Sequence, residues 1–186
     1  MPVFTENVLV IENGSGSSNG NGDGQINSGE VVDLIIPVSN YGNANAVQIN
    51  GTLTSENSNV TVVNDTYFYG DLSSGGIVSN DSSPFTISVN NDVHDESSVR
   101  LLLTLSNDSG YVSTGYLELQ ISGKNVYAYG IDVVGSSQDV LSSGETSEVH
   151  VELHNIGSTS AQSIIGTITS ASAAIDIIDN LSLIHI

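Results

Sequence analysis

The sequence predicts an all-β protein, built as a tandem immunoglobulin-like antiparallel β-sandwich whose second copy is incomplete. Short runs rich in Val, Ile, Thr and Tyr alternate apolar with polar residues, whereas apolar residues do not recur at the helical period of about 3.6. About seven or eight such runs, separated by turn-rich segments, fill residues 1–122, which is typical of an immunoglobulin-type sandwich. The pattern then begins again. We therefore expect a complete sandwich over residues 1–122 and a truncated second repeat over residues 123–186.

The first expected strand covers residues 3–11 and leads into a polar loop. Beyond the loop, the alternate residues Leu34, Ile36 and Val38 are apolar and are expected to face inward together. Pro37 lies on the opposite face, and because proline cannot donate to a ladder it predicts an edge strand. In the following run, Gly51 predicts a β-bulge or a close approach of another chain segment.

The remaining part of the first repeat continues the alternation in the runs 60–62, 66–72, 84–89, 99–105 and 116–121. In the last three runs apolar residues occupy every second position, so one face of each strand is expected to enter the core. The predicted inward residues are Phe85, Ile87, Val89, Val99, Leu101, Leu103, Leu105, Leu117, Leu119 and Ile121.

The segment NGNGDGQINSGE, residues 19–30, matches the pattern of a twelve-residue calcium loop. Alternate residues of a tightly turning loop point inward at one ion, and a late glutamate closes the shell with both carboxylate oxygens. Gly24 stands at the sixth position, where the chain must turn sharply. The predicted Ca2+ ligands are Asn19, Asn21, Asp23, Gln25 (through its carbonyl), Asn27 and Glu30, with Glu12 as a candidate extra ligand.

The composition of this loop also limits the prediction. The first ligand position holds Asn19 where aspartate is preferred, so only two carboxylates face the ion. This predicts weak binding, with a Kd of about 10⁻⁴–10⁻³ M as in extracellular modules. Because Asn, Gly and Asp are also common in linkers, a plain polar linker is the alternative interpretation.

An internal repeat links the two halves of the chain. Gly144 lies 115 residues after Gly29, and at this spacing residues 29–55 match residues 144–170 without a gap. The repeats differ at the loop, where Gln138 replaces Asp23 and only Asp139 and Glu145 remain as acidic residues, so Ca2+ is assigned to the first repeat. The second copy is expected to stop near Asn180, and the final LSLIHI does not match the repeat. The identical pairs are Gly29/Gly144, Glu30/Glu145, Asn40/Asn155, Gly42/Gly157, Gly51/Gly166 and Thr52/Thr167.

The charge balance excludes several classes of partner. The chain contains 21 acidic residues and two basic ones, Arg100 and Lys124, for a net charge of -19. No basic patch can be assembled, which excludes nucleic acid and disfavours anionic membrane surfaces. No apolar run reaches membrane-spanning length, so we expect no membrane insertion. Since cysteine is absent, disulfides and thiolate metal sites are excluded.

A series of short motifs in residues 23–46 resembles a known family. In chain order they are Asp23-Gly24, Asn27-Ser28-Gly29-Glu30, the apolar run from Leu34 to Val38, Asn40-Tyr41-Gly42 and the small residues Ala44 to Ala46. This order resembles the opening of the CARDB-like, bacterial cell-adhesion-related sandwich domains, with Ser28 in place of the usual proline. Such modules accompany secreted proteases and surface proteins of bacteria and archaea. The resemblance implies a secreted, extracellular protein at the cell surface.

Three other groups of residues are candidate chemical sites. His150, Glu152 and His154 alternate on one strand face and could bind a transition metal, but a solvent-facing strand is favoured. His94 lies in an acidic loop without a nucleophile motif, so a solvated loop is favoured over catalysis. Aromatic residues could form a platform for sugars, although half of them are expected to enter the core. The aromatic residues considered are Tyr67, Phe68, Tyr69, Tyr111 and Tyr116.

These observations predict a non-enzymatic, calcium-binding structural or adhesion repeat of a secreted or cell-surface protein. Its expected partners are calcium and neighbouring repeats or like subunits of a surface assembly, with self-assembly into a fibre or filament as one form of that role. The alternative is an accessory or carbohydrate-binding module attached to a secreted hydrolase. Exposed Tyr67 and Tyr69 on a flat face would favour this alternative.

Overall fold

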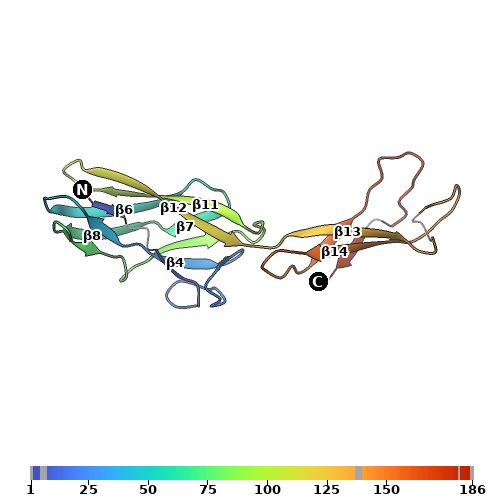
Figure 1. Cartoon of the computed structure of the whole chain (residues 1–186), viewed down its shortest axis with the longest axis horizontal. Coiled ribbons are helices and arrows are strands. Elements are labelled where there is room, and N and C mark those ends of the chain that lie inside the picture. Colours follow the sequence, from blue (N-terminus) through green and yellow to red (C-terminus); the bar gives the residue numbers. More distant parts are fainter. Residues whose placement is uncertain (1, 5–7, 137–139, 180, 185–186) are drawn as a thin grey trace. The chain divides into compact units, whose positions relative to one another are not determined.

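The computed structural model describes residues 2–4, 8–136, 140–179 and 181–184, and these residues form an all-β protein with several antiparallel sheets (Figure 1). The described residues include no helix that could cross a membrane. The chain divides into two compact units, residues 1–123 and residues 124–186, which are treated separately below.

The described residues of the first unit form twelve strands in three sheets. The four-stranded sheet has the order β2-β4-β10-β7, the five-stranded sheet β3-β12-β11-β6-β8, and the small third sheet β1-β5-β9. Neighbouring strands are antiparallel except for β3 and β12, which are parallel. The strands are β1 (Pro2–Phe4), β2 (Leu9–Ile11), β3 (Ile26–Asn27), β4 (Val31–Ile35), β5 (Val38–Asn40), β6 (Ala46–Ser55), β7 (Val60–Asn64), β8 (Thr66–Leu72), β9 (Ile77–Val78), β10 (Phe85–Val89), β11 (Ser97–Ser106) and β12 (Val112–Ser122).

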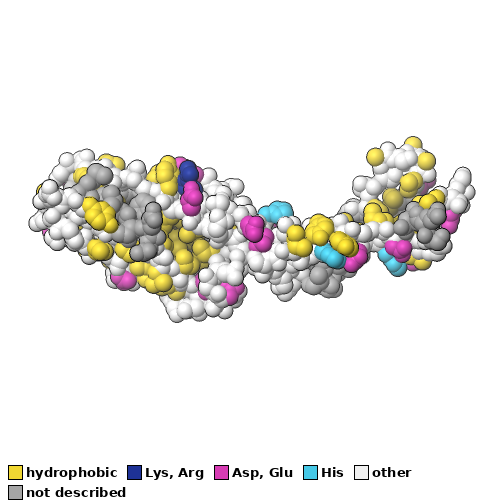
Figure 2. Space-filling model, viewed as in Figure 1, with side chains coloured by type: hydrophobic (Ala, Val, Ile, Leu, Met, Phe, Trp, Pro, Cys, Tyr) yellow, Lys and Arg dark blue, Asp and Glu magenta, His cyan; other side chains and the backbone are white. Residues whose placement is uncertain are grey.

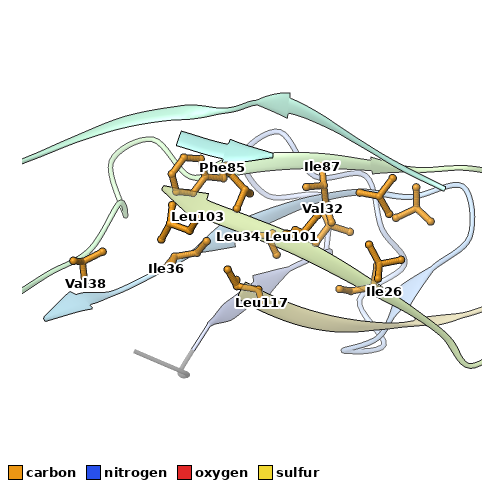
Figure 3. Packing of buried hydrophobic residues seen from close by; sticks show 14 of the residues in the cluster. Ile26, Val32, Leu34, Ile36, Val38, Phe85, Ile87, Leu101, Leu103 and Leu117 are labelled. Atoms are coloured by element: carbon orange, nitrogen blue, oxygen red, sulfur yellow. The ribbon is translucent and has the colours of Figure 1, made fainter. Parts of the chain in front are cut away.

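The two larger sheets share one hydrophobic core, consistent with a β-sandwich (Figure 3). The core combines side chains of β4 and β10 from one sheet with side chains of β6, β11 and β12 from the other. The predicted inward residues are buried, except that Leu119 is only partly buried. Assignment of this sandwich to the immunoglobulin type stays a prediction. Its largest fully buried residues include Leu34, Ile36, Ile49, Leu53, Phe85, Ile87, Leu101, Leu103, Leu105 and Ile121.

The prediction of an edge strand at Pro37 is wrong. Pro37 lies between the end of β4 at Ile35 and the start of β5 at Val38, and β4 has a partner on each side, β2 and β10. Proline has no N–H to donate, so the ladder is interrupted at Pro37 and the chain passes from the four-stranded sheet to the three-stranded sheet. The expected first strand, residues 3–11, is likewise divided between β1 and β2, and residues 5–7 lie outside the described residues.

Gly51 confirms the predicted close approach. A Cβ atom added at Gly51 would lie 2.6 Å from Cε2 of Tyr69 and 3.5 Å from the ring of Phe85. The register between β6 and β8 also shifts next to this position, between Ile49 and Asn50. The missing side chain therefore creates the space in which the buried Tyr69 ring packs.

In the second unit the residues that the structure describes form two separate two-stranded sheets, β13-β14 and β15-β16. Among its described side chains only Val133 and Ala161 belong to the buried hydrophobic residues. The last of these strands lies within LSLIHI, of which residues 185–186 are outside the described residues. The strands are β13 (Val126–Val133), β14 (Val149–Asn155), β15 (Ile164–Thr167) and β16 (Leu181–Ile184).

The strand registers reproduce the internal repeat. In the first unit Val3 pairs with Ser39 and Val10 pairs with Leu34. In the second unit Tyr127 pairs with His154 and Val133 pairs with Val149, so both β14 residues lie 115 positions after their first-unit counterparts. The pair Thr167 and Leu181 likewise corresponds to Thr52 and Thr66, which places β16 at the register of β8, although LSLIHI does not match β8 in sequence.

Local hydrogen bonds repeat at the same spacing. The Asn40 side chain accepts from Gly42 N and donates to Ala44 O, and Asn155 makes the same two bonds to Gly157 and Thr159. These paired bonds show that the second unit folds locally like the opening half of the first unit.

Candidate calcium loop

The predicted calcium loop lies in the segment that connects β2 to β4 and contains the short strand β3. At its centre, Gly24 adopts a φ of 83°, a left-handed conformation that favours glycine, as expected for the sharp turn at the sixth position. β3 pairs with the end of β12 through Ile26 with Ile121 and Asn27 with Ser122. Ser28 N also donates to Ser122 O over 3.0 Å. The loop is therefore fastened to the last strand of the first unit.

Glu30 is buried beneath the loop, and its carboxylate accepts several hydrogen bonds from it. Oε1 accepts from Asn21 N over 3.1 Å, and Oε2 accepts from Asn27 N over 2.9 Å. The Asn27 side-chain amide adds a longer bond of 3.4 Å to Oε1. A buried carboxylate needs such partners because desolvation penalises its charge. Glu30 thus brings Asn21 and Asn27, from the early and the late part of the predicted ligand set, close together.

Asp23 and Asn21 form the exposed side of the same cluster. Asn21 Oδ1 accepts from Asp23 N over 2.8 Å, and Asp23 Oδ1 accepts from Gln25 N over 2.8 Å, which makes two successive Asx turns. Asp23 Oδ2 accepts from the side-chain amides of Asn21 and Asn27, each over 3.1 Å. The Gln25 N–H, followed by the Asn27 amide, lowers the pKa of Asp23 below its ordinary value of 3.8.

Two of the six predicted ligand side chains are directed elsewhere. Asn19 Oδ1 accepts from Val31 N over 2.6 Å, while Asn19 N donates to Val31 O over 3.0 Å. The Gln25 side chain accepts from Ser122 Oγ over 2.5 Å, whereas the predicted ligand atom of Gln25 is its backbone carbonyl oxygen. The structure therefore gathers Asn21, Asp23, Asn27 and Glu30, and it separates the Asn19 side chain from them.

Glu12 and Asp33 also accept hydrogen bonds from the loop. The sequence predicted Glu12 only as a candidate extra ligand and did not single out Asp33. Glu12 is buried, and its two oxygens accept from Gly22 N over 2.6 Å and Gly24 N over 2.7 Å. Asp33 is also buried and accepts from Ser17 N and Thr86 Oγ1. Each of these acids stands next to Val, Leu or Ile in an apolar strand segment. A carboxylate within or directly after such a segment is the sequence signal that could have identified both residues.

The donor chemistry of the cluster fits calcium. Its side chains offer carboxylate and amide oxygens, the ligand type that Ca2+ prefers. The Asn27 amide lies between the carboxylates of Asp23 and Glu30, and its oxygen and nitrogen can exchange places by a side-chain flip. After such a flip the amide oxygen would face the two carboxylates, and a cation between them would stabilise this arrangement. The described residues contain no group of three or more His, Cys, Asp or Glu that could hold a metal ion, and the predicted ligand set combines two carboxylates with amide oxygens.

The second repeat retains one element of the loop. Ser142 N donates to Glu145 Oε2 over 2.8 Å, as Asn27 N donates to Glu30 Oε2 in the first repeat. Gln138 and Asp139 lie outside the described residues. The glutamate turn is thus common to both repeats, whereas the amide side chain of Asn27 is replaced by Ser142.

The other candidate sites are placed as follows. His150 and Glu152 are exposed on β14, and His154 Nε2 lies 2.9 Å from Glu152 Oε1 and stacks on Tyr129. His94 is exposed in its loop. Tyr69 is only 4% exposed and donates its hydroxyl to Ile36 O, and Tyr67 is half-buried against it. Tyr67 and Tyr69 therefore do not form the flat exposed face that sugar binding requires.

Comparison with solved structures finds neighbours of low sequence identity. No family model and no curated protein matches the chain. One solved structure is trypsin-activated alpha-2-macroglobulin from Escherichia coli, with 12% identity, a TM-score of 0.40 and coverage of 69% of this chain and 9% of that chain. Another is a chaperone–tip adhesion subunit pre-assembly complex from the archaic chaperone-usher Csu pili of Acinetobacter baumannii, with 11% identity, a TM-score of 0.25 and coverage of 86% and 81%.

Proposed function

We propose that this chain is a non-enzymatic, calcium-binding structural or adhesion repeat of a secreted or cell-surface protein. The observation that carries the proposal is the convergence of the Asp23 and Glu30 carboxylates on the amide of Asn27. In this proposal Asn21, Asp23, Asn27 and Glu30 hold the ion through side-chain oxygens, and the Gln25 carbonyl completes the set. Calcium, when bound, supplies the positive charge that offsets the two carboxylates.

The position of the loop supports a structural role for the ion. The loop connects β2 to β4 in one sheet, and through β3 it is hydrogen-bonded to β12 in the other sheet. Any ligand that binds only the folded loop stabilises the folded unit by mass action. Calcium would therefore stabilise the connection between the two sheets at this end of the sandwich.

The charge and the resemblance to CARDB-like modules support an extracellular setting. A net charge of -19 destabilises a compact chain through self-repulsion, and divalent cations or salt reduce this repulsion. The alternative role, a carbohydrate-binding or accessory module of a secreted hydrolase, loses support because Tyr69 is buried. Like subunits or neighbouring repeats are the partners we propose for a surface assembly.

Thermal unfolding with calcium and with excess chelator tests the proposal. At about 10 mM Ca2+ and the weak affinity expected, binding stabilises the first unit by about 1–3 kcal/mol. We expect the melting temperature to rise by several degrees in the wild type and not in the double variant Asp23→Ala/Glu30→Ala.

The matched control is Asp108→Ala, which removes one carboxylate from the exposed turn at residues 107–110. This variant should keep the full calcium response. An equal calcium-induced shift in the Asp23→Ala/Glu30→Ala variant, or no shift in the wild type, would reduce the loop to a polar linker held by Glu12 and Glu30 alone.

A further inference from the structure

The second unit retains core residues that its own strands do not cover. Residues 115 positions after the buried Leu34, Ile36 and Val60 are again aliphatic: Val149, Val151 and Ile175. Their exposed fractions are 38%, 39% and 46%, whereas the first-unit counterparts are at most 4% exposed. Figure 2 shows hydrophobic side chains on the visible surface of the part of the chain that contains β13 and β14. Val149, Val151 and Ile175 are named the acceptor face, because their counterparts Leu34, Ile36 and Val60 belong to one core cluster in the first unit.

The first unit shows which strands cover the equivalent face. Its core contains Phe85 and Ile87 from β10, and alternating aliphatic residues from β11 and β12. β6 pairs with β8 on one side and β11 on the other. Its counterpart β15 has β16 at the register of β8, and within the described residues nothing pairs with β15 at the position of β11.

A second detail indicates an absent neighbour. β4 begins at Val31 and pairs with β10 from Val31 to Leu34. The repeat spacing places the counterpart of Val31 at residue 146, yet β14 begins only at Val149. In an extended segment without a ladder partner, the backbone N–H and C=O groups form hydrogen bonds with water instead of with a second strand. We therefore attribute the later start of β14 to the absence, among the described residues, of a counterpart of β10.

We propose that the acceptor face and the open edge of β15 bind a β-hairpin of a partner polypeptide, with aliphatic residues at every second position as in β11 and β12. The match in register between the two units specifies the pattern, because strands that fit β6 and the core in the first unit fit the same positions in the second. This proposal is independent of calcium.

Charge favours such a hairpin over a second copy of the chain. Residues 124–186 contain seven acidic residues and one basic residue, Lys124, so two second units placed face to face bring together two net charges of -6. Residues 97–122 contain Arg100 against Asp108 and Glu118, a net charge of -1. A hairpin with the low charge of residues 97–122 would cover the apolar face with little electrostatic repulsion.

A synthetic peptide with the sequence of residues 97–122, added to the isotope-labelled 186-residue chain, tests the proposal. We expect saturable binding, and slower amide hydrogen exchange in Ile164–Thr167 of β15. The variant Val151→Asp places a charge on the acceptor face and should weaken binding by about tenfold or more. Glu152→Gln, at an exposed position on the opposite face of β14, should leave binding unchanged.

Two further variants serve as controls for this binding experiment. Ile175→Asp lies outside the strands and repeats the test if Val151→Asp disturbs the β13-β14 ladder. A peptide carrying Leu101→Asp and Leu103→Asp should not bind. Absence of binding, equal binding by Val151→Asp and wild type, or a peptide-free dimer that Val151→Asp converts to a monomer would each overturn the proposal.

Discussion

At the residue scale, Glu12 and Glu30 are the two buried carboxylates around which the loop of the first unit folds. Each accepts backbone N–H groups from the loop: Gly22 and Gly24 donate to Glu12, and Asn21 and Asn27 donate to Glu30. Hydrogen bonds to a charged acceptor contribute about 1.5–3 kcal/mol each, roughly twice a neutral bond. These two residues therefore define the loop path, and Asp23 and Asn27 add the side-chain oxygens that we propose as calcium ligands.

Tyr69 gives a second prediction at the same scale. Burial raises the pKa of the Tyr69 hydroxyl above its ordinary value of 10.0, and the neighbouring Tyr67 adds to the shift. Above pH 10 the unfolded chain loses this proton while the folded chain keeps it, so the stability contribution is complete below pH 10 and declines as the pH rises further. Tyr69→Phe should abolish this alkaline component.

The same variant should cost about 1–3 kcal/mol at neutral pH, because Ile36 O loses the hydroxyl that donates to it. Denaturant unfolding at pH 7 and at several values above pH 10 measures both effects. Tyr41→Phe is the control, since Tyr41 is 74% exposed and should change neither quantity. An alkaline dependence that survives in Tyr69→Phe would assign it to other groups.

At the scale of elements, β6 determines how closely the layers of the first unit pack. It lies between β8 and β11, and Gly51 leaves the space that the Tyr69 ring occupies. A methyl group at Gly51 would overlap the Tyr69 ring. The hydroxyl of this ring donates a hydrogen bond to the carbonyl of Ile36, the residue that follows β4. The ring cannot move away without leaving that carbonyl unpaired.

Gly51→Ala should therefore destabilise the first unit by about 1–3 kcal/mol, the usual cost of overpacking a well-filled core. Chemical denaturation followed by circular dichroism measures the change. Gly110→Ala is a steric control because a Cβ there meets nothing within 4 Å, although its positive φ of 84° adds backbone strain. The crowding account fails if Gly51→Ala unfolds at the same denaturant concentration as the wild type.

At the scale of the whole molecule, charge opposes folding. The two units carry only one basic residue each, Arg100 and Lys124, and Arg100 is already paired with Glu118 over 3.1 Å. Mutual repulsion among the remaining acidic groups is screened over a distance of about 10 Å at 0.1 M salt. Monovalent salt should consequently stabilise the chain even when no calcium is present.

With excess chelator, the melting temperature should rise by several degrees between about 0.02 M and 0.5 M sodium chloride. Differential scanning calorimetry measures this shift. Sucrose, which is uncharged, is the control for general exclusion effects and should give no comparable change over the dilute range. A melting temperature that falls or stays constant with salt would show that repulsion is not a significant cost.

The sequence alone determined the all-β class and the internal repeat, because both depend on periodic patterns along the chain. Alternation predicted which side chains of β4, β10 and β11 enter the core, and the spacing of 115 residues predicted a repeat whose matching residues occupy equivalent register positions in the structure. Turn chemistry at Gly24 was equally local. Such features need no knowledge of distant contacts.

Only the tertiary structure decided how the loop is closed and where the chain changes sheets. Glu12 reaches Gly22 and Gly24, and Gln25 reaches Ser122, across separations that no local pattern encodes. Pro37 was read as an edge signal because its missing N–H is visible in the sequence, whereas the sheet change that accommodates it is not. Likewise, the sequence predicted an incomplete second repeat, and only the structure showed that its aliphatic side chains Val149, Val151 and Ile175 remain exposed, because burial depends on which strands pack against each other.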